Sequence, residues 1–135
     1  MNKRPTSRYS KSLILAFGLM LIIFGTVTII YPEIMTRYGL IIEDVHAKST
    51  IMAVIGGSEI GLGLFILIGQ KFEVSIDARL GLLLLVFTGI FAARIFSAFL
   101  YHAELPGVFF RELFAELLIT IMLIIALYRE KFSPR

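Results

Sequence analysis

The chain has no cysteine and no tryptophan among its 135 residues. Without cysteine it can form no disulfide, no thiolate metal site and no Cys-x-x-Cys redox pair. Charged residues are also scarce, at 17% of the chain against 58% hydrophobic residues. A soluble domain of this size has too much surface to cover with so few polar side chains. The composition therefore indicates a protein of the lipid bilayer.

The basic residues do not indicate a nucleic-acid partner. The net charge is +3 and the sequence pI is about 9.4. However, the basic residues concentrate in the two tails and one short loop, which membrane topology explains without a polyanion. Nucleic-acid binding is therefore not expected.

Four apolar segments are each long enough to cross about 30 Å of hydrocarbon as a helix. They cover residues 12–31, 49–70, 80–101 and 108–128. Backbone groups in lipid must be satisfied within the segment, which requires helices, and the alternation typical of a membrane β-strand is absent. The sequence therefore predicts an all-α, polytopic membrane protein, a bundle of four transmembrane helices forming one domain over residues 1–135.

Basic residues also predict the orientation of the bundle. They flank the first helix on its N-terminal side, lie between the second and third helices, and follow the fourth: Lys3, Arg4, Arg8, Lys11, Lys71, Arg79, Arg129, Lys131 and Arg135. The positive-inside rule then places both termini in the cytoplasm. The first apolar run is too long for a signal peptide and no small-x-small cleavage site follows it, which favours a retained helix.

The outer segment, residues 32–48, is longer than a turn. Its apolar residues alternate with charges at loosely helical spacing. Two interpretations remain open, a short interfacial helix or flap lying on the bundle, and an ordinary structured loop.

Three ionisable residues lie within the predicted spans at similar depth. Glu59, Arg94 and Glu116 are about 15, 10 and 12 Å from the outer surface at about 1.5 Å per residue. A single charge in hydrocarbon costs about 2.5–3.5 kcal/mol on insertion scales. Because Arg94 can neutralise a carboxylate through charge-assisted hydrogen bonds, we expect the three groups to converge inside the bundle.

Further polar residues extend this predicted cluster. Glu112 lies one turn outward of Glu116, and Ser97 and Ser58 are hydrogen-bonding neighbours. One arginine cannot balance all the carboxylates, so a surplus carboxylate is a candidate site for a proton, a cation or a polar ligand. The alternative is that the buried polar groups only hold the helices together.

Glycines line two sides of the second predicted helix. Gly57 and Gly61 continue a small-residue stripe from Ala53, and Gly56 and Gly63 lie nearer Glu59. Small faces of this kind allow close helix packing. They predict a central helix between two neighbours, with homodimerisation through Gly57 and Gly61 as the alternative.

The stretches "AVIGGSEIGLGLFIL" and "ARIFSAFLYHAELPGVFFRELFAELLITIMLIIAL" resemble the small four-helix bacterial inner-membrane proteins of domain-of-unknown-function family 4345, which are distantly DoxX-like. The resemblance covers residues 32–128. The matching positions are Gly56, Gly57, Gly61, Gly63, Arg94, Ser97, Pro106 and Glu116. Ala93 departs from the pattern, which usually has glycine there. The resemblance implies the fold, the polar cluster and a place in the bacterial inner (cytoplasmic) membrane, but the family has no established activity.

Three functions follow from these residues. The first is a lipid or small-molecule pocket formed by Glu59, Arg94, Ser97, Glu112 and Glu116. The second is a structural or accessory membrane subunit, and the third, less favoured, is a proton-coupled small transporter. No catalytic signature, cofactor or metal motif is present, and His46 and His102 are interpreted as interfacial side chains. The expected partners are the bilayer, a lipid or small-molecule ligand, and a second copy or another membrane protein.

Overall fold

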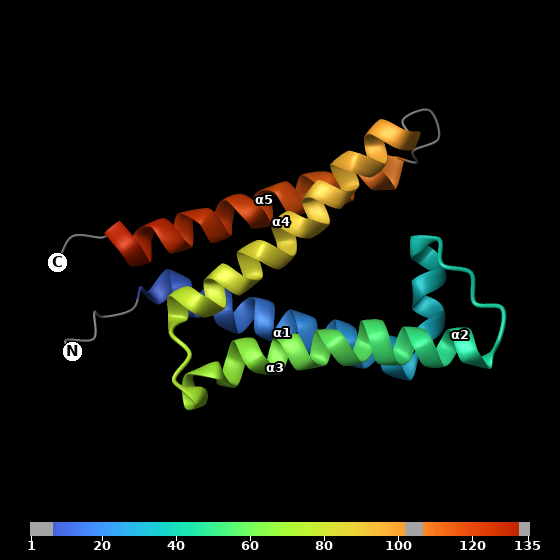
Figure 1. The fold of residues 1–135 in the computed structure, drawn as a ribbon, viewed down its shortest axis with the longest axis horizontal. Helices are drawn as coiled ribbons and strands as arrows, with labels where there is room; N and C mark the ends of the chain where they lie inside the picture. Colours follow the sequence, from blue (N-terminus) through green and yellow to red (C-terminus); the bar gives the residue numbers. More distant parts are fainter. Residues whose placement is uncertain (1–6, 102–106, 133–135) are drawn as a thin grey trace. The chain divides into compact units, whose positions relative to one another are not determined.

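The structure is a computed structural model that describes residues 7–101 and 107–132. Every regular element in these two ranges is helical, which confirms the predicted all-α class (Figure 1). In chain order the elements are α1 (Arg8–Ile30), η1 (Pro32–Tyr38), α2 (Val45–Thr50), η2 (Ile51–Gly57), α3 (Ser58–Ile68), η3 (Gly69–Phe72), α4 (Ile76–Tyr101) and α5 (Gly107–Phe132). Elements η1 and η3 are 3₁₀-helices, and η2 is a π-helix.

Three helical stretches are long and apolar enough to cross a membrane. They are Arg8–Ile30, Val45–Phe72 and Ile76–Leu100, and the second runs from α2 through η3 without a break. Their mean hydropathy values are 2.7, 2.2 and 2.1. The chain is therefore a helical membrane protein. The fourth predicted segment forms α5, a helix of 26 residues with Arg111, Glu112 and Glu116 near its start.

The helices extend beyond the apolar segments because their N-terminal caps lie in the polar flanks. The Asp44 carboxylate accepts a hydrogen bond from the Ala47 N–H at 2.7 Å, and the Ser75 hydroxyl oxygen accepts one from the Ala78 N–H at 3.2 Å. Such caps satisfy backbone donors that have no partner within the helix. As a result Arg79, which the sequence predicted to lie between the second and third helices, is part of α4. It lies in the first turn of α4 and is only 4% exposed.

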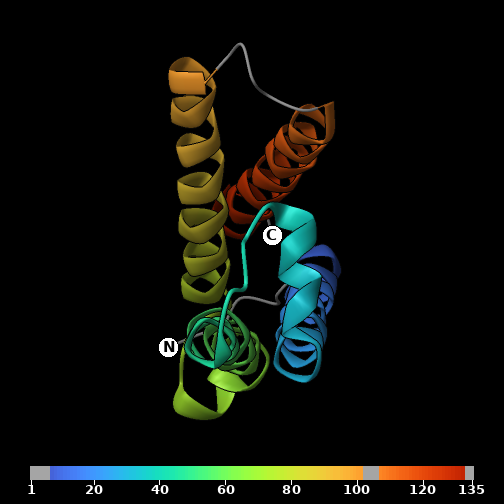
Figure 2. The ribbon, with the colours of Figure 1, turned by 90° about the vertical axis from the view of Figure 1, so that its right-hand side faces the viewer.

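The chain divides into two compact units. The first comprises residues 1–11 and 75–135, and the second residues 12–74. In the first unit α4 packs against the antiparallel α5 (Figures 1 and 2). The start of the chain meets the end of α5, where the Arg129 guanidinium lies 5.5 Å from the centre of the Tyr9 ring. The Ser7 N–H also donates to the Glu130 carboxylate at 2.9 Å.

In the second unit α1 packs against η2 and α3 along two pairs of glycines. A methyl group added at Gly25 would lie 2.5 Å from the Gly56 carbonyl oxygen, and one at Gly63 would lie 2.7 Å from the Gly18 carbonyl oxygen. The pairs are seven residues apart on both antiparallel helices, the spacing at which helices repeat a contact. We call these four glycines the glycine seam. It lets the two backbones approach more closely than any side chain would permit.

The other two predicted packing glycines do not belong to this seam. Within the described residues, a methyl group at Gly61 would have no neighbour within 4 Å, and one at Gly57 would meet only the Met52 carbonyl oxygen at 3.7 Å. Homodimerisation through Gly57 and Gly61 stays a prediction.

The segment of residues 32–48 contains a short helix, η1, followed by an irregular stretch to Asp44. Gly39 ends η1 with a φ of 81°, a conformation that favours glycine. The Tyr38 ring packs edge-on against Phe24 of α1 with centroids 6.2 Å apart, so η1 is tied to the helix that precedes it. The Lys48 ammonium pairs with the Glu33 carboxylate, and this hydrogen bond lowers the pKa of Glu33 below its usual value.

Candidate functional site

The candidate site lies on the faces of α4 and α5 that contact each other. Along these faces, buried apolar residues are followed by charged ones. On α4 the buried Phe87 is followed by Arg94 seven residues later, so both occupy the same face of the helix. On α5 Glu116 lies seven residues after the buried Phe109 and seven before the buried Leu123. Heptad spacing therefore brings the arginine of one helix towards the glutamate of the other.

Arg94 makes two ion pairs with α5. Its Nε lies 2.5 Å from Oε1 of Glu116, and its Nη1 lies 2.9 Å from Oε2 of Glu112. The guanidinium carbon also lies 5.9 Å from the centre of the Phe109 ring, within cation–π range. All three partners come from one face of α5, because residues 109, 112 and 116 follow helical spacing. We call Arg94, Glu112 and Glu116 the Arg94 cluster.

The charges of the Arg94 cluster do not cancel. Two carboxylates and one guanidinium sum to a formal charge of −1 when all three are ionised. The side chains of Arg94, Glu112 and Glu116 are 28%, 24% and 12% exposed. Oε2 of Glu116 is buried and has no hydrogen-bond partner among the described residues. A buried acceptor without a donor is costly.

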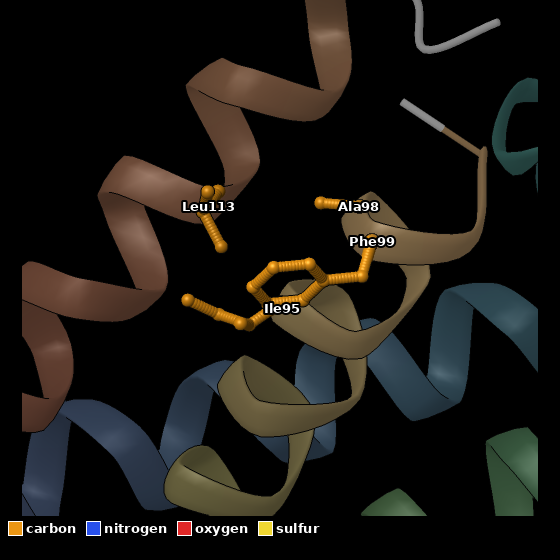
Figure 3. A pocket seen from close by; sticks show the side chains of 4 residues that line it. All are labelled: Ile95, Ala98, Phe99 and Leu113. Atoms are coloured by element: carbon orange, nitrogen blue, oxygen red, sulfur yellow. The ribbon is translucent and has the colours of Figure 1, made fainter. Parts of the chain in front are cut away.

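An apolar cleft lies between the same two helices, lined by residues that neighbour Arg94 and Glu112 in the chain. It has a volume of about 390 Å³ and is lined by Ile95, Ala98 and Phe99 of α4 and Leu113 of α5. Figure 3 shows the side chains of Ile95, Phe99 and Leu113 extending into the space between the helices. Phe99 is 76% exposed, so the cleft is open on one side.

Ser97 and Glu59 are the remaining site residues expected from the sequence. Ser97 is half-buried on α4, one turn beyond Arg94. Glu59 lies in the other compact unit, at the start of α3, so the structure brings together three of the four predicted charged residues. A methyl group added at Gly25 of α1 would lie 3.0 Å from the Glu59 Cβ. Oε2 of Glu59 is buried without a hydrogen-bond partner among the described residues.

The π-helix η2 ends at Gly57, two residues before Glu59. The Ser58 hydroxyl donates to carbonyl oxygens in the preceding turn, that of Val54 and that of Ile55, the latter at 3.0 Å. In a π-helix the regular α-helical bonds are displaced, and a serine hydroxyl can satisfy the freed carbonyl groups. Ser58 therefore completes the backbone hydrogen bonding of its own helix, and nothing in its contacts assigns it to the Arg94 cluster.

Sequence reasoning missed Phe109 and the apolar cleft. A signal for Phe109 was present, because an aromatic residue three positions before Glu112 and seven before Glu116 shares their helix face. The cleft had no such signal. Its lining residues are ordinary apolar residues of the two helices, and only the angle at which α4 and α5 diverge creates the space.

The described ranges contain no group of three His, Asp or Glu side chains that could hold a metal ion. His46 lies in α2, whereas His102 and Pro106 fall outside the described residues. Comparison of the chain with protein-family models, with curated proteins and with solved structures finds no match.

Proposed function

We propose that the protein is a four-span protein of the bacterial inner membrane that binds a lipid or small molecule between α4 and α5. In this proposal both termini are cytoplasmic, and the chain is related to domain-of-unknown-function family 4345. The observation that carries the proposal is the unpartnered Oε2 of Glu116 in a cluster with a surplus negative charge, with an apolar cleft between the same two helices.

The fourth span of the proposal is α5. Its 26 residues exceed the length needed to cross about 30 Å. Its glutamates at 112 and 116 are paired with Arg94, which lowers the penalty for placing them in hydrocarbon. Arg111 is exposed near the helix start, where a long side chain can reach the interface.

Because the chain lacks cysteine, single cysteines can test this topology. Glu43, Lys71 and Phe132 are exposed positions that cap no helix, and each is replaced by cysteine in turn. A membrane-impermeant maleimide should label the cysteine at 43 from the outside. The cysteines at 71 and 132 should react only after the membrane is permeabilised. Labelling of 132 together with 43 would show that α5 does not cross.

Ligand binding is tested by a mass-spectrometric inventory of the lipids and small molecules that copurify with the protein. The wild type should retain a specific molecule that Ala98→Phe, which fills the cleft, loses. Leu85→Phe is the matched control, since it adds an aromatic ring on an exposed face of α4 outside the cleft. Equal content in all three proteins would count against the pocket.

A structural role is the second candidate, favoured by the two ion pairs through which Arg94 joins α4 to α5. In that case the Arg94 cluster only holds the helices together. A ligand pocket predicts a copurifying molecule that the wild type carries and Ala98→Phe loses, whereas a purely structural role predicts no specific molecule in either protein. A wild type that carries no specific molecule, together with a loss of folding in every charge variant, would favour the structural role.

A further inference from the structure

We propose that the ligand of the α4–α5 site is an amphiphilic amine, with its ammonium group at Glu116 and Glu112 and its hydrocarbon chain in the cleft. This inference rests on the ligand-binding function proposed above and adds the chemical class of the ligand. It follows from the charge of the Arg94 cluster, the acceptor that the cluster leaves without a partner, and the position of the cleft.

The charge of the Arg94 cluster favours a cation. Arg94 is already engaged by both carboxylates, through Nε to Glu116 and through Nη1 to Glu112. An anionic headgroup would meet the surplus negative charge of the two glutamates. An ammonium group brings the formal sum from −1 to zero. In a low-dielectric surround, where charge interactions are strong, this difference determines which headgroup binds.

The hydrogen bonding of the Arg94 cluster favours a cationic headgroup, as its charge does. Oε2 of Glu116 is a buried acceptor with no donor among the described residues. An ammonium group has three N–H donors, so it can supply this bond and direct another to the Glu112 carboxylate. A hydroxyl group could donate one hydrogen bond but would leave the charge of −1 in place. A carboxylate could donate none.

The apolar cleft lies between the same two helices, and its lining residues neighbour the Arg94 cluster in the chain. On α4 its residues Ile95 and Ala98 follow Arg94 within about one turn, and on α5 Leu113 lies between Glu112 and Glu116. Its volume of about 390 Å³ is at the lower end of the range of about 300–1,000 Å³ for small-molecule sites. Phe99, one of the lining residues (Figure 3), is exposed, so the cleft is open at that side chain. A single alkyl chain could therefore enter from the lipid.

Selectivity should reside in the headgroup, because moving an alkyl chain from acyl chains into an apolar cleft yields little hydrophobic free energy. Chains of equal length with different headgroups are therefore the informative probes. Dodecylammonium, dodecanol and dodecanoate differ in charge, at +1, 0 and −1, while their hydrocarbon parts are nearly the same. Ranking their affinities for one protein isolates the contribution of the Arg94 cluster.

The experiment measures binding of these three probes by native mass spectrometry of the full chain in phosphatidylcholine nanodiscs. Dodecylammonium should bind the wild type at least about tenfold more tightly than the other two. Glu116→Gln should remove most of this preference, since it removes the surplus charge. Ala98→Phe should weaken binding of dodecylammonium about tenfold, and Leu85→Phe should leave it unchanged.

The outcomes separate this inference from the proposed function. If dodecanoate or dodecanol bound more tightly, and Ala98→Phe abolished that binding, the ligand would not be an amine. The proposed pocket between α4 and α5 would still be supported. Binding of none of the probes, together with no copurifying molecule, would overturn both. Dodecylammonium binding that is equal in wild type, Glu116→Gln and Ala98→Phe would show simple partitioning into lipid and would also overturn the inference. Should Glu116→Gln fail to fold, Glu112→Gln removes the same charge.

Discussion

Replacing Gly25 by alanine should separate α1 from the helix that carries Gly56. The added methyl group would lie 2.5 Å from the Gly56 carbonyl oxygen, and 2.9 Å from Cγ1 of Ile60. Ordinary contact begins near 3.4 Å, so the two backbones must move apart by about 0.9 Å at this point. A carbonyl oxygen within a helix cannot turn aside as the end of a flexible side chain can. The two helices should therefore move apart along the whole glycine seam.

The magnitude follows from two opposing effects. Overpacking a well-packed interior costs about 1–3 kcal/mol. Alanine is better than glycine within a helix by about 0.8–1.0 kcal/mol. Gly61→Ala is the matched control, because it gains the same propensity and meets no neighbour within 4 Å among the described residues. The difference between the two variants therefore isolates the contact, and Gly25→Ala should be less stable than Gly61→Ala by about 1–3 kcal/mol.

The lack of native cysteine provides the assay. Thr28 of α1 is fully buried, and Thr28→Cys introduces one thiol of similar size. Its reaction with a maleimide at increasing SDS concentration reports opening of the protein, and the midpoints give the difference in unfolding free energy. The glycine variants are compared in this background. Equal midpoints for Gly25→Ala and Gly61→Ala would refute the close approach of the two helices.

Other predictions concern the charged groups. Arg94→Gln should lower the unfolding free energy by about 2–4 kcal/mol, because it leaves two carboxylates unpaired, and addition of Glu116→Gln should restore part of the loss in the same SDS titration. Glu59→Gln should instead raise stability by about 1–2 kcal/mol, since it removes a half-buried carboxylate with no hydrogen-bond partner among the described residues; a decrease would indicate an essential partner. The pKa of Glu33 is lowered in the folded protein, so the Lys48 pair contributes above the usual glutamate pKa and is lost as pH falls through the folded value. The hydrogen-exchange protection factors of residues 32–48, measured relative to the intrinsic exchange rate at each pH, should therefore fall at acid pH, and Lys48→Gln should abolish this pH dependence of protection.

Much of the fold could be predicted from the sequence because lipid imposes strong constraints. An apolar run of about 20 residues has few alternatives to a helix. The helix ends were less predictable, since the caps at Asp44 and Ser75 lie outside the apolar runs that define the spans. Arg79 was assigned to a loop for the same reason, although it lies within α4.

The candidate site was predictable in part. The meeting of Arg94 with Glu116 and Glu112 follows from the high cost of isolated charges in hydrocarbon. The glycine seam was only partly recognised, because glycines on two sides of a helix do not reveal which side meets a neighbour. Gly56 and Gly63 pack against α1, whereas Gly57 and Gly61 do not. The cleft depends on how two helices diverge, which no local pattern encodes.

The π-helix η2 has a consequence for how the chain tolerates changes in length. Its hydrogen bonds join residues five apart, so the segment holds a residue more than an α-helix with the same number of turns would need. Deleting Ala53 or Val54, both exposed, would let this segment close into an ordinary α-helix. The residues from Gly56 onwards would keep their contacts with α1. A one-residue deletion, which in a regular helix would rotate everything beyond it by about 100°, could be absorbed here.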